Sequence, residues 1–325
     1  MPDHPYVSTG SLPPEDQISA LIMATHRRFA SNDAGENASV YPALAEVPRD
    51  LFGICVVSAG GAVYACGDAE YEFTIMSVSK PFMFALICQE IGAEAARATI
   101  GVNSTGLPFN SVMAIELNAT RTVNPMVNAG AIATTSLTPG ASAGARWRFI
   151  HDGLSRFAGR SLSLNETVYA SATATNQRNQ GIANLLKSYG RIHCDPCEAI
   201  DLYTKQCSLN VSAKDLAVMA ATLADGGVNP LTRERVIDAE HCKRVLAVMA
   251  TAGMYETSGD WLFETGLPGK SGIGGGIVTV APGKGGLGTF APLLDTAGNS
   301  VKGQFATRYL SEQLGLNLFA SNPVT

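Results

Sequence analysis

Apolar positions along the chain follow two different periods, and the change of period separates strand-forming from helix-forming stretches. Two apolar runs near the start, 51–57 and 62–66, flank the turn residues Ala59-Gly60-Gly61 and predict two strands of a hairpin. Near the end of the chain, Gly and Pro residues again bound short apolar runs. Three further strands are predicted there, over 261–264, 276–280 and 286–291.

Between these stretches, apolar residues recur every three to four positions, as they do on one face of a helix. A first helix is predicted over 17–30, where Ile18 and Ile22 share that spacing. A second runs from about Ser77 to Ile91 and is stopped by a glycine. The remaining helices are predicted over 125–136, 145–158, 178–189, 197–207, 212–224, 242–249 and about 300–314.

Strands at both ends of the sequence with helices between them predict an α/β fold of the α+β type. One antiparallel sheet is built from both chain ends and flanked by helices, and a helical lobe is inserted into it. We expect a single domain over 17–318, with the sheet lobe at about 17–76 and 255–318 and the helical lobe at about 77–254. Residues 1–16 predict a loose arm and 319–325 a tail. A cleft is expected where the two lobes meet.

Composition and charge exclude several classes of protein. Hydrophobic residues make up 46% of the 325 residues, but no apolar run approaches the roughly 18 residues of a membrane span. The net charge of -5 offers no basic surface for nucleic acid. The first residues lack the basic end and apolar run of a secretory signal, so a cytoplasmic location is expected.

The seven cysteines are scattered and odd in number, which favours reduced thiols in a cytoplasmic protein. Cys194-Asp195-Pro196-Cys197 follows His193 and suggests a redox pair or half of a zinc site. No second Cys pair or spaced His pair accompanies it, so ordinary loop cysteines are favoured. The pattern therefore disfavours a metal or redox role for these cysteines.

The tetrapeptide Ser77-Val78-Ser79-Lys80 places a hydroxyl and an amine one helical turn apart, on the same face of a helix. A neutral lysine at that position accepts the proton of Ser77 and turns the hydroxyl into a nucleophile. Because Ser77 begins a helix, backbone N–H groups and the positive end of the helix dipole surround its oxygen. The alternative is that Ser77 only caps the helix and Lys80 is solvated.

A second motif, Lys270-Ser271-Gly272, favours a catalytic role for Ser77 and Lys80 over a helix cap and a solvated lysine. Serine β-lactamases and penicillin-binding proteins pair S-x-x-K with a later K-[ST]-G on an edge strand beside the nucleophile, and the order and spacing fit here. The glycine-rich residues 272–276 let backbone approach a substrate closely. A backbone N–H there and that of Ser77 would form an oxyanion hole worth several kcal/mol. The alternative is a plain glycine-rich turn.

These and other motifs resemble one family, the serine-dependent glutaminases, which share the β-lactamase-like fold. The likeness covers roughly residues 20–318, and its most specific part is the block Asn-Pro-Met-Val-Asn-Ala-Gly-Ala at 124–131. The segments that carry the likeness are 77–82, 124–132, Val168-Tyr169, Arg178-Asn179, 223–227 and 269–276.

The resemblance implies an amidohydrolase that converts L-glutamine and water to L-glutamate and ammonia through a γ-glutamyl-Ser77 intermediate. It implies Ser77 as nucleophile, Lys80 as its base, and Tyr255 as a hydroxyl that relays a proton to departing ammonia or serves as base in deacylation. It also implies that no metal or organic cofactor is needed and that the protein is a homotetramer or dimer. The implied substrate-binding positions are Ser77, Asn128, Asn179, Tyr203, Tyr255 and the backbone of Ile273.

Two positions depart from the family pattern. The family has Tyr-Ile-Pro near its N-terminal strand, whereas this chain has Val40-Tyr41-Pro42, so the tyrosine is either shifted by one residue or replaced by Val40. Ala172 stands where the family has a glutamate that resembles an anchor for the substrate's α-ammonium group. Losing such a charge-assisted contact costs on the order of 2–3 kcal/mol.

The departures keep other functions open. One is a related serine amidohydrolase that acts on a different amide because Val40 and Ala172 alter the pocket. A β-lactamase is disfavoured by the missing export signal and by the block at 124–131. A non-catalytic member that binds an amino acid or a partner is the third, and the presence of Ser77, Lys80 and Lys270 counts against it.

Overall fold

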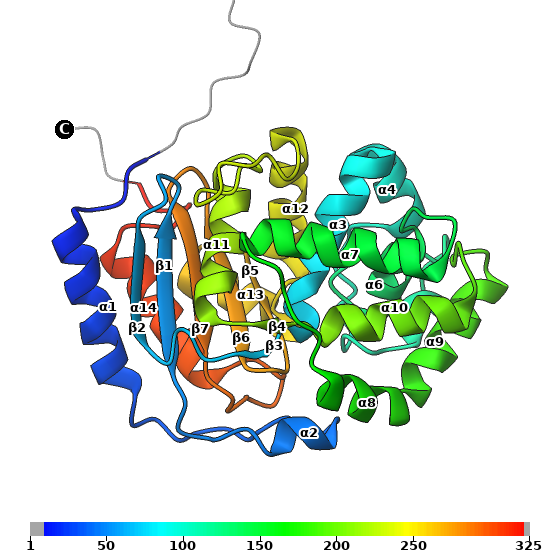
Figure 1. The fold of residues 1–325 in the computed structure, drawn as a ribbon, viewed down its shortest axis with the longest axis horizontal. Helices are drawn as coiled ribbons and strands as arrows, with labels where there is room; N and C mark the ends of the chain where they lie inside the picture. The colour runs from blue at the N-terminus through cyan, green and yellow to red at the C-terminus, as the bar shows by residue number, and fades with distance from the viewer. Residues whose placement is uncertain (1–9, 322–325) are drawn as a thin grey trace, which may run out of the picture.

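The centre of the fold is a five-stranded antiparallel sheet with the strand order β2-β1-β7-β6-β5 (Figure 1). A computed structural model describes residues 10–321; the parts of the predicted arm and tail at 1–9 and 322–325 lie outside the described residues. The strands are β1 (Gly53–Ser58), β2 (Val63–Gly67), β5 (Gly269–Ser271), β6 (Gly276–Ala281) and β7 (Gly285–Phe290). β1 pairs with β7, so the sheet is assembled from both chain ends, as predicted.

Helices cover both faces of the sheet, and a helical lobe extends from one of them (Figure 1). α1 (Glu15–Phe29) and α14 (Val301–Gln313) pack on one face, and α11 (Ala213–Ala224) packs on the other. A two-stranded ladder joins β3 (Phe73–Thr74) to β4 (Asn210–Val211). The other helices are α2 (Pro42–Ala45), α3 (Ser79–Ile91), α4 (Ala93–Ile100), α5 (Met113–Glu116), α6 (Asn128–Ser136), α7 (Ala143–Ala158), α8 (Glu166–Ala174), α9 (Gln177–Ser188), α10 (Pro196–Cys207), α12 (Ala239–Ala252) and α13 (Ser258–Thr265).

β7 contacts α11 without large side chains between them, because its residues facing that helix include Gly286 and Gly288. Alternate residues of a strand face the same side of a sheet. A methyl group on Gly288 would overlap the carbonyl oxygen of Ala213 and lie 2.7 Å from the backbone nitrogen of Ala217. The opposite face of the strand carries Leu287, which joins the apolar cluster beneath α1 and α14. Glycine therefore sets the spacing between the sheet and the helical lobe.

Replacing Gly288 with valine is expected to lower the free energy of unfolding by about 2–4 kcal/mol, because α11 has to move away from β7. The midpoint of urea unfolding measures this change. Gly259→Ala is the matched control, since no atom lies within 4 Å of the added methyl group in α13. The control is expected to be neutral or stabilising by about 0.5–1 kcal/mol. Equal destabilisation in both variants would contradict this account of the packing.

α3 is apolar on every side and is buried through most of its length, from Ser79 to Cys88. It packs against the 3₁₀ turn before it and against α4, α6, α7 and α12. A helix that is hydrophobic all round belongs in a protein core. Within its buried length this helix carries polar side chains only at its first turn, and the exposed Gln89 and Glu90 follow near its end. No helix of the described residues, α3 included, is both long and apolar enough to cross a membrane.

The predicted strand at 261–264 is wrong, because these residues lie in α13 (Ser258–Thr265). Four residues are too few to separate a strand from a helix by periodicity. The wider segment shows the helical spacing, since Ser258, Trp261 and Thr265 are buried at intervals of three and four. The indole N–H of Trp261 donates to the Leu267 carbonyl, which anchors the end of this helix. The edge strand β5 has only three residues, too few for a hydrophobic pattern. Its position is predicted instead by the Lys270-Ser271-Gly272 motif.

Candidate active site

A cavity of about 450 Å³ opens between the sheet and the inserted helices. Its walls come from the turn before α3, from α6, α8, α9 and α10, and from the loops at 36–41, 273 and 294–298. Lys80 and Tyr255 lie behind the wall, in contact with Asn128 and Ser77 respectively. The structure thus brings all the residues implied by the family resemblance to one place. Those that line the cavity are Ser77, Asn128, Asn179, Tyr203 and Ile273.

Ser77 lies in a 3₁₀ turn, Met76–Val78, immediately before α3. Met76 has φ of 46°, a left-handed conformation that is uncommon outside glycine and is often found at functional sites. Within the described part of the chain, the N–H groups of Ser77 and Ile273 donate no hydrogen bond to other protein groups. Two free N–H groups beside a serine hydroxyl are the requirement for an oxyanion hole.

Strand β5 brings Lys270-Ser271-Gly272 directly beside this turn. A methyl group on Gly272 would lie 3.0 Å from the Ile75 carbonyl oxygen and 3.2 Å from the Ser77 nitrogen. β5 is the edge strand of the sheet, next to β6, so the predicted edge-strand position of the motif is confirmed. Gly272 is therefore required for the close approach of the two backbones.

The amine of Lys80 is buried and has two protein acceptors. Its Nζ donates to the Met126 carbonyl at 3.2 Å and to Oδ1 of Asn128 at 2.8 Å. Burial lowers the pKa of Lys80 to about 8, because the charged form loses its hydration. No carboxylate partners this amine within the described residues. A lysine near that pKa is available in its neutral form at mildly alkaline pH.

Tyr255 and Lys270 lie together on the sheet side of Ser77. The Tyr255 hydroxyl donates to the Ser271 carbonyl at 3.3 Å, and Lys270 Nζ lies 4.2 Å from the centre of the Tyr255 ring. Burial raises the pKa of Tyr255 to about 12, although hydrogen bonds with the Ser77 and Ser271 side chains oppose this shift. Burial, and secondly the Lys80 charge, hold the pKa of Lys270 well below its usual range. Tyr255 therefore stays protonated near neutral pH and can donate a proton.

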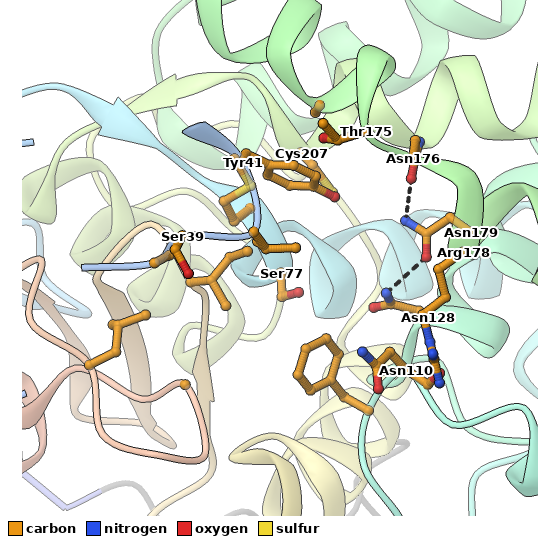
Figure 2. A pocket seen from close by; sticks show the side chains of 18 of the residues that line it. Ser39, Tyr41, Ser77, Asn110, Asn128, Thr175, Asn176, Arg178, Asn179 and Cys207 are labelled. Atoms are coloured by element: carbon orange, nitrogen blue, oxygen red, sulfur yellow. Dashed lines mark hydrogen bonds between the residues drawn. The ribbon is translucent and has the colours of Figure 1, made fainter. Parts of the chain in front are cut away.

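Three asparagines form a directed chain of hydrogen bonds along one wall of the cavity (Figure 2). Asn128 Nδ2 donates to Asn179 Oδ1 at 3.0 Å, and Asn179 Nδ2 donates to Asn176 Oδ1 at 2.7 Å. Asn176 Nδ2 continues the chain to the Thr204 hydroxyl at 2.9 Å. At the other end, Asn128 Oδ1 receives Lys80 and the Tyr203 hydroxyl, the latter at 3.3 Å. The chain thus fixes the orientation of each amide.

Three residues of this site carried no usable signal in the sequence. Asn176 stands just before α9 and completes the asparagine chain. Cys207 ends α10, lines the cavity and lies beside Tyr41 in Figure 2. Arg178 belongs to a segment that resembles the family, but nothing in the pattern placed its charge at the cavity. The Asn176–Asn179 spacing of three residues was the one hint available.

The two departures from the family pattern both lie at the cavity. Val40 and Tyr41 each line it, so a tyrosine is present on that wall even though its place in the motif has shifted. Burial raises the pKa of Tyr41 to about 12. Ala172 also lines the cavity, near the end of α8, and offers only a methyl group there.

Taken together, the geometry suits attack on the carbonyl of a small amide. A serine hydroxyl, a buried amine of lowered pKa, a protonated phenol and two free backbone N–H groups meet at one point. The asparagine chain and Arg178 give the far wall polar groups for a charged substrate. These are the parts that acyl transfer requires: nucleophile, base, acid and oxyanion stabilisation.

Comparison with known sequences gives one family. The family model described as Glutaminase matches residues 35–319. Glutaminase 2 of Yersinia pestis is 66% identical over 320 residues, which is 98% of this chain and 94% of that protein. The glutaminase of Colwellia psychrerythraea is 47% identical over 307 residues, covering 94% of this chain and 99% of that protein.

Comparison with solved structures agrees. The probable glutaminase ybaS superposes with a TM-score of 0.94 at 43% identity, covering 95% of this chain and 100% of that one. A probable glutaminase from Bacillus subtilis, complexed with 6-diazo-5-oxo-L-norleucine, has a TM-score of 0.83 at 29% identity and covers 97% of this chain and 99% of that one. Each match runs through both the sheet and the inserted helices.

Proposed function

Because the chain belongs to the glutaminase family and is an enzyme that hydrolyses L-glutamine to L-glutamate and ammonia, we propose that Ser77 carries this reaction as the nucleophile of a two-step mechanism. The β-lactamase-like fold predicted from the sequence is confirmed by the structural neighbours.

The observation that carries the proposal is the bonding of Lys80. A neutral amine has two N–H groups and one lone pair. In this site two acceptors, the Met126 carbonyl and Asn128 Oδ1, engage the N–H groups. The lone pair is left for the hydroxyl of Ser77, one helical turn away. Lys80 therefore accepts the Ser77 proton as the oxygen attacks the γ-carbonyl.

The rest of the first step follows from the surrounding donors. As the Ser77 oxygen bonds to the carbonyl carbon, negative charge develops on the amide oxygen, and the N–H groups of Ser77 and Ile273 receive it. The Tyr255 hydroxyl, protonated and in contact with Ser77, passes a proton to the departing nitrogen. The C–N bond breaks and ammonia leaves, which gives a γ-glutamyl ester on Ser77.

In the second step water attacks the ester, and its proton goes to Tyr255, which lost its own to ammonia, or to Lys80 once the Lys80 proton has passed back to Tyr255. The Ser77–carbonyl bond breaks, Ser77 regains a proton, and L-glutamate leaves. Both steps use the same oxyanion hole, as expected when one site forms and hydrolyses a covalent intermediate. Asn128, Asn179 and Tyr203 hold the amino-acid end of the substrate in this proposal.

Hydroxylamine partitioning tests the covalent intermediate. L-glutamine and L-glutamate γ-methyl ester would form the same Ser77 ester, so a fixed hydroxylamine concentration is expected to give the same ratio of γ-glutamyl hydroxamate to L-glutamate from both. The products are separated and counted after identical turnover. Ratios that differ between the two substrates would rule out a shared acyl-enzyme, because direct attack on each substrate depends on its own leaving group.

We also propose a cytoplasmic location and an oligomeric state. The location is supported by the seven cysteines, all of which are free. A homotetramer or dimer is supported by exposed apolar side chains on and beside α5, where Met113 is 51% and Leu117 is 70% exposed. Large apolar side chains gathered at one surface are typical of protein interfaces.

A further inference from the structure

The asparagine wall presents hydrogen-bond donors to the cavity more than acceptors. Asn128 Oδ1 already accepts from Lys80 and Tyr203, and the oxygens of Asn179 and Asn176 each accept from the neighbouring amide. Each Nδ2 gives one of its two N–H groups to the chain, so one N–H per amide remains. Carboxylates and other acceptors are satisfied by such a wall, whereas an ammonium group brings only donors.

Of the described residues that line the cavity, Arg178 is the one with a permanent positive charge, and it lies beside the asparagine chain. Among the described residues, Arg178 forms no ion pair; its Nε donates to the Asn110 carbonyl at 2.9 Å, and its terminal N–H groups donate to no carboxylate. Figure 2 shows Arg178 beside Asn110 and Asn128. Arginine matches the fork of a carboxylate with its own paired donors. A substrate carboxylate therefore has its counter-ion here.

No lining carboxylate is left for an α-ammonium group. Of the described residues, Glu36 and Asp295 are the acidic ones that line the cavity. Glu36 is paired with Arg49 at 2.7 Å, and its side chain is 83% exposed. Asp295 accepts from the backbone of Ala297 and Asn299 and from the Gln304 side chain, each at 2.9 Å. Both carboxylates are therefore engaged elsewhere.

The end of α8 does not supply the missing acceptor. Ala172 lines the cavity with a methyl group, and its carbonyl accepts from the Thr175 backbone at 3.2 Å. The Ser171 carbonyl is taken by the Thr175 hydroxyl, and the Ala174 carbonyl by the Gln177 side chain. These three carbonyl oxygens at the C-terminal end of α8 thus already accept hydrogen bonds from residues just after them in the chain.

We propose that this enzyme also hydrolyses ω-amides whose α-nitrogen is neutral, with Nα-acylated glutamine as the substrate class, about as efficiently as glutamine itself. The inference rests on the proposed function, since it uses the same Ser77 chemistry. It follows from the charges at the cavity: a carboxylate is recognised, and the α-ammonium has no anionic partner whose loss would weaken binding. A cavity of about 450 Å³ lies within the range that holds ligands larger than one amino acid.

The reaction balances as it does for glutamine. Ser77 Oγ bonds to the side-chain carbonyl carbon of Nα-acetyl-L-glutamine, the C–N bond breaks, and ammonia leaves with the proton delivered to its nitrogen. Water then cleaves the ester and releases Nα-acetyl-L-glutamate. The acyl group on the α-nitrogen takes no part in either step.

Three substrates test the proposal on the unmodified enzyme: L-glutamine, Nα-acetyl-L-glutamine and glutaric acid monoamide, which has no α-nitrogen. Their kcat/KM values, from ammonia release, are expected to agree within about tenfold, whereas loss of a charge-assisted contact would separate them by about tenfold to a hundredfold. A deficit of more than about tenfold for Nα-acetyl-L-glutamine overturns the proposal. Absence of glutamine hydrolysis would instead overturn the proposed function, so the two failures are distinguishable.

A pair of variants at Ala172 tests the cause. Ala172→Glu adds a carboxylate, and is expected to raise the preference for L-glutamine over Nα-acetyl-L-glutamine by about tenfold to a hundredfold. Ala172→Gln, which has nearly the same size and no charge, is expected to leave that preference within about threefold of the original enzyme. An equal shift in both variants, or no shift with glutamate, would overturn the electrostatic explanation.

Discussion

Ser77→Ala is expected to lower kcat for ammonia release from L-glutamine by about 10⁴-fold to 10⁶-fold, because the variant lacks the oxygen that bonds to the γ-carbonyl carbon. Binding should change little, since the asparagine chain and Arg178 are untouched. Calorimetric titration of the variant with L-glutamine measures binding without turnover. Residual hydrolysis above about 1% of the original rate would rule out Ser77 as the nucleophile.

The matched control is Ser79→Ala, in the same turn of the chain. The Ser79 hydroxyl donates to the Met76 carbonyl at 2.8 Å and accepts from the Gln206 side chain at 2.8 Å, so its loss should affect stability. We expect kcat to fall by less than about tenfold in this variant, because a serine oxygen still occupies position 77. The pair separates loss of the nucleophile from loss of a buried hydroxyl.

Lys80→Met is expected to lower kcat/KM by about 10²-fold to 10⁴-fold, the range assigned to a positioned general base. Methionine fills a similar space. Asn128 Oδ1 keeps its hydrogen bond from the Tyr203 hydroxyl, so this buried oxygen still has a donor in the variant. In the original enzyme kcat/KM should rise with pH through about 8, because the neutral amine is the base and the protonated amine is inactive. The variant should lose that rise.

Lys302→Met is the control for removing a buried lysine. Lys302 lies on α14 against the Phe52 ring, at 5.6 Å from its centre, and does not line the cavity. We expect its pH profile to keep the rise through about 8. If Lys80→Met also kept it, the titrating base would be another group, and Lys270 would be the first to replace next.

Much of the fold could be predicted because strand and helix periods differ clearly over long segments. The pairing of β1 with β7 follows from strands at both chain ends. The glycines of β7 are the sequence feature that corresponds to the close contact between this strand and α11. The short segment around Trp261 failed because four apolar residues fit either period. Its buried face appears only when Ser258 and Thr265 are considered with it.

The site was predictable where local spacing carries the chemistry. Ser77 and Lys80 are one helical turn apart, so sequence alone brings them together. Asn176 reaches the cavity from the start of α9 and Cys207 from the end of α10, and no local sequence pattern predicts that these two residues lie close together. The direction of each amide in the chain is set by Lys80 at one end and Thr204 at the other. This donor-to-acceptor direction along the asparagine chain is set by contacts that exist only in the folded protein.

A sheet assembled from both ends of the chain also governs how the protein is made. During synthesis β1 and β2 leave the ribosome long before β7, which supplies the other hydrogen-bonded neighbour of β1. An unpaired strand edge is a site for association with other chains. Formation of the complete sheet must therefore wait for nearly the whole polypeptide, and the distance in sequence between its partners makes this step slow. Truncation after α12 would leave the hairpin of β1 and β2 without β7, the strand that pairs with the other edge of β1.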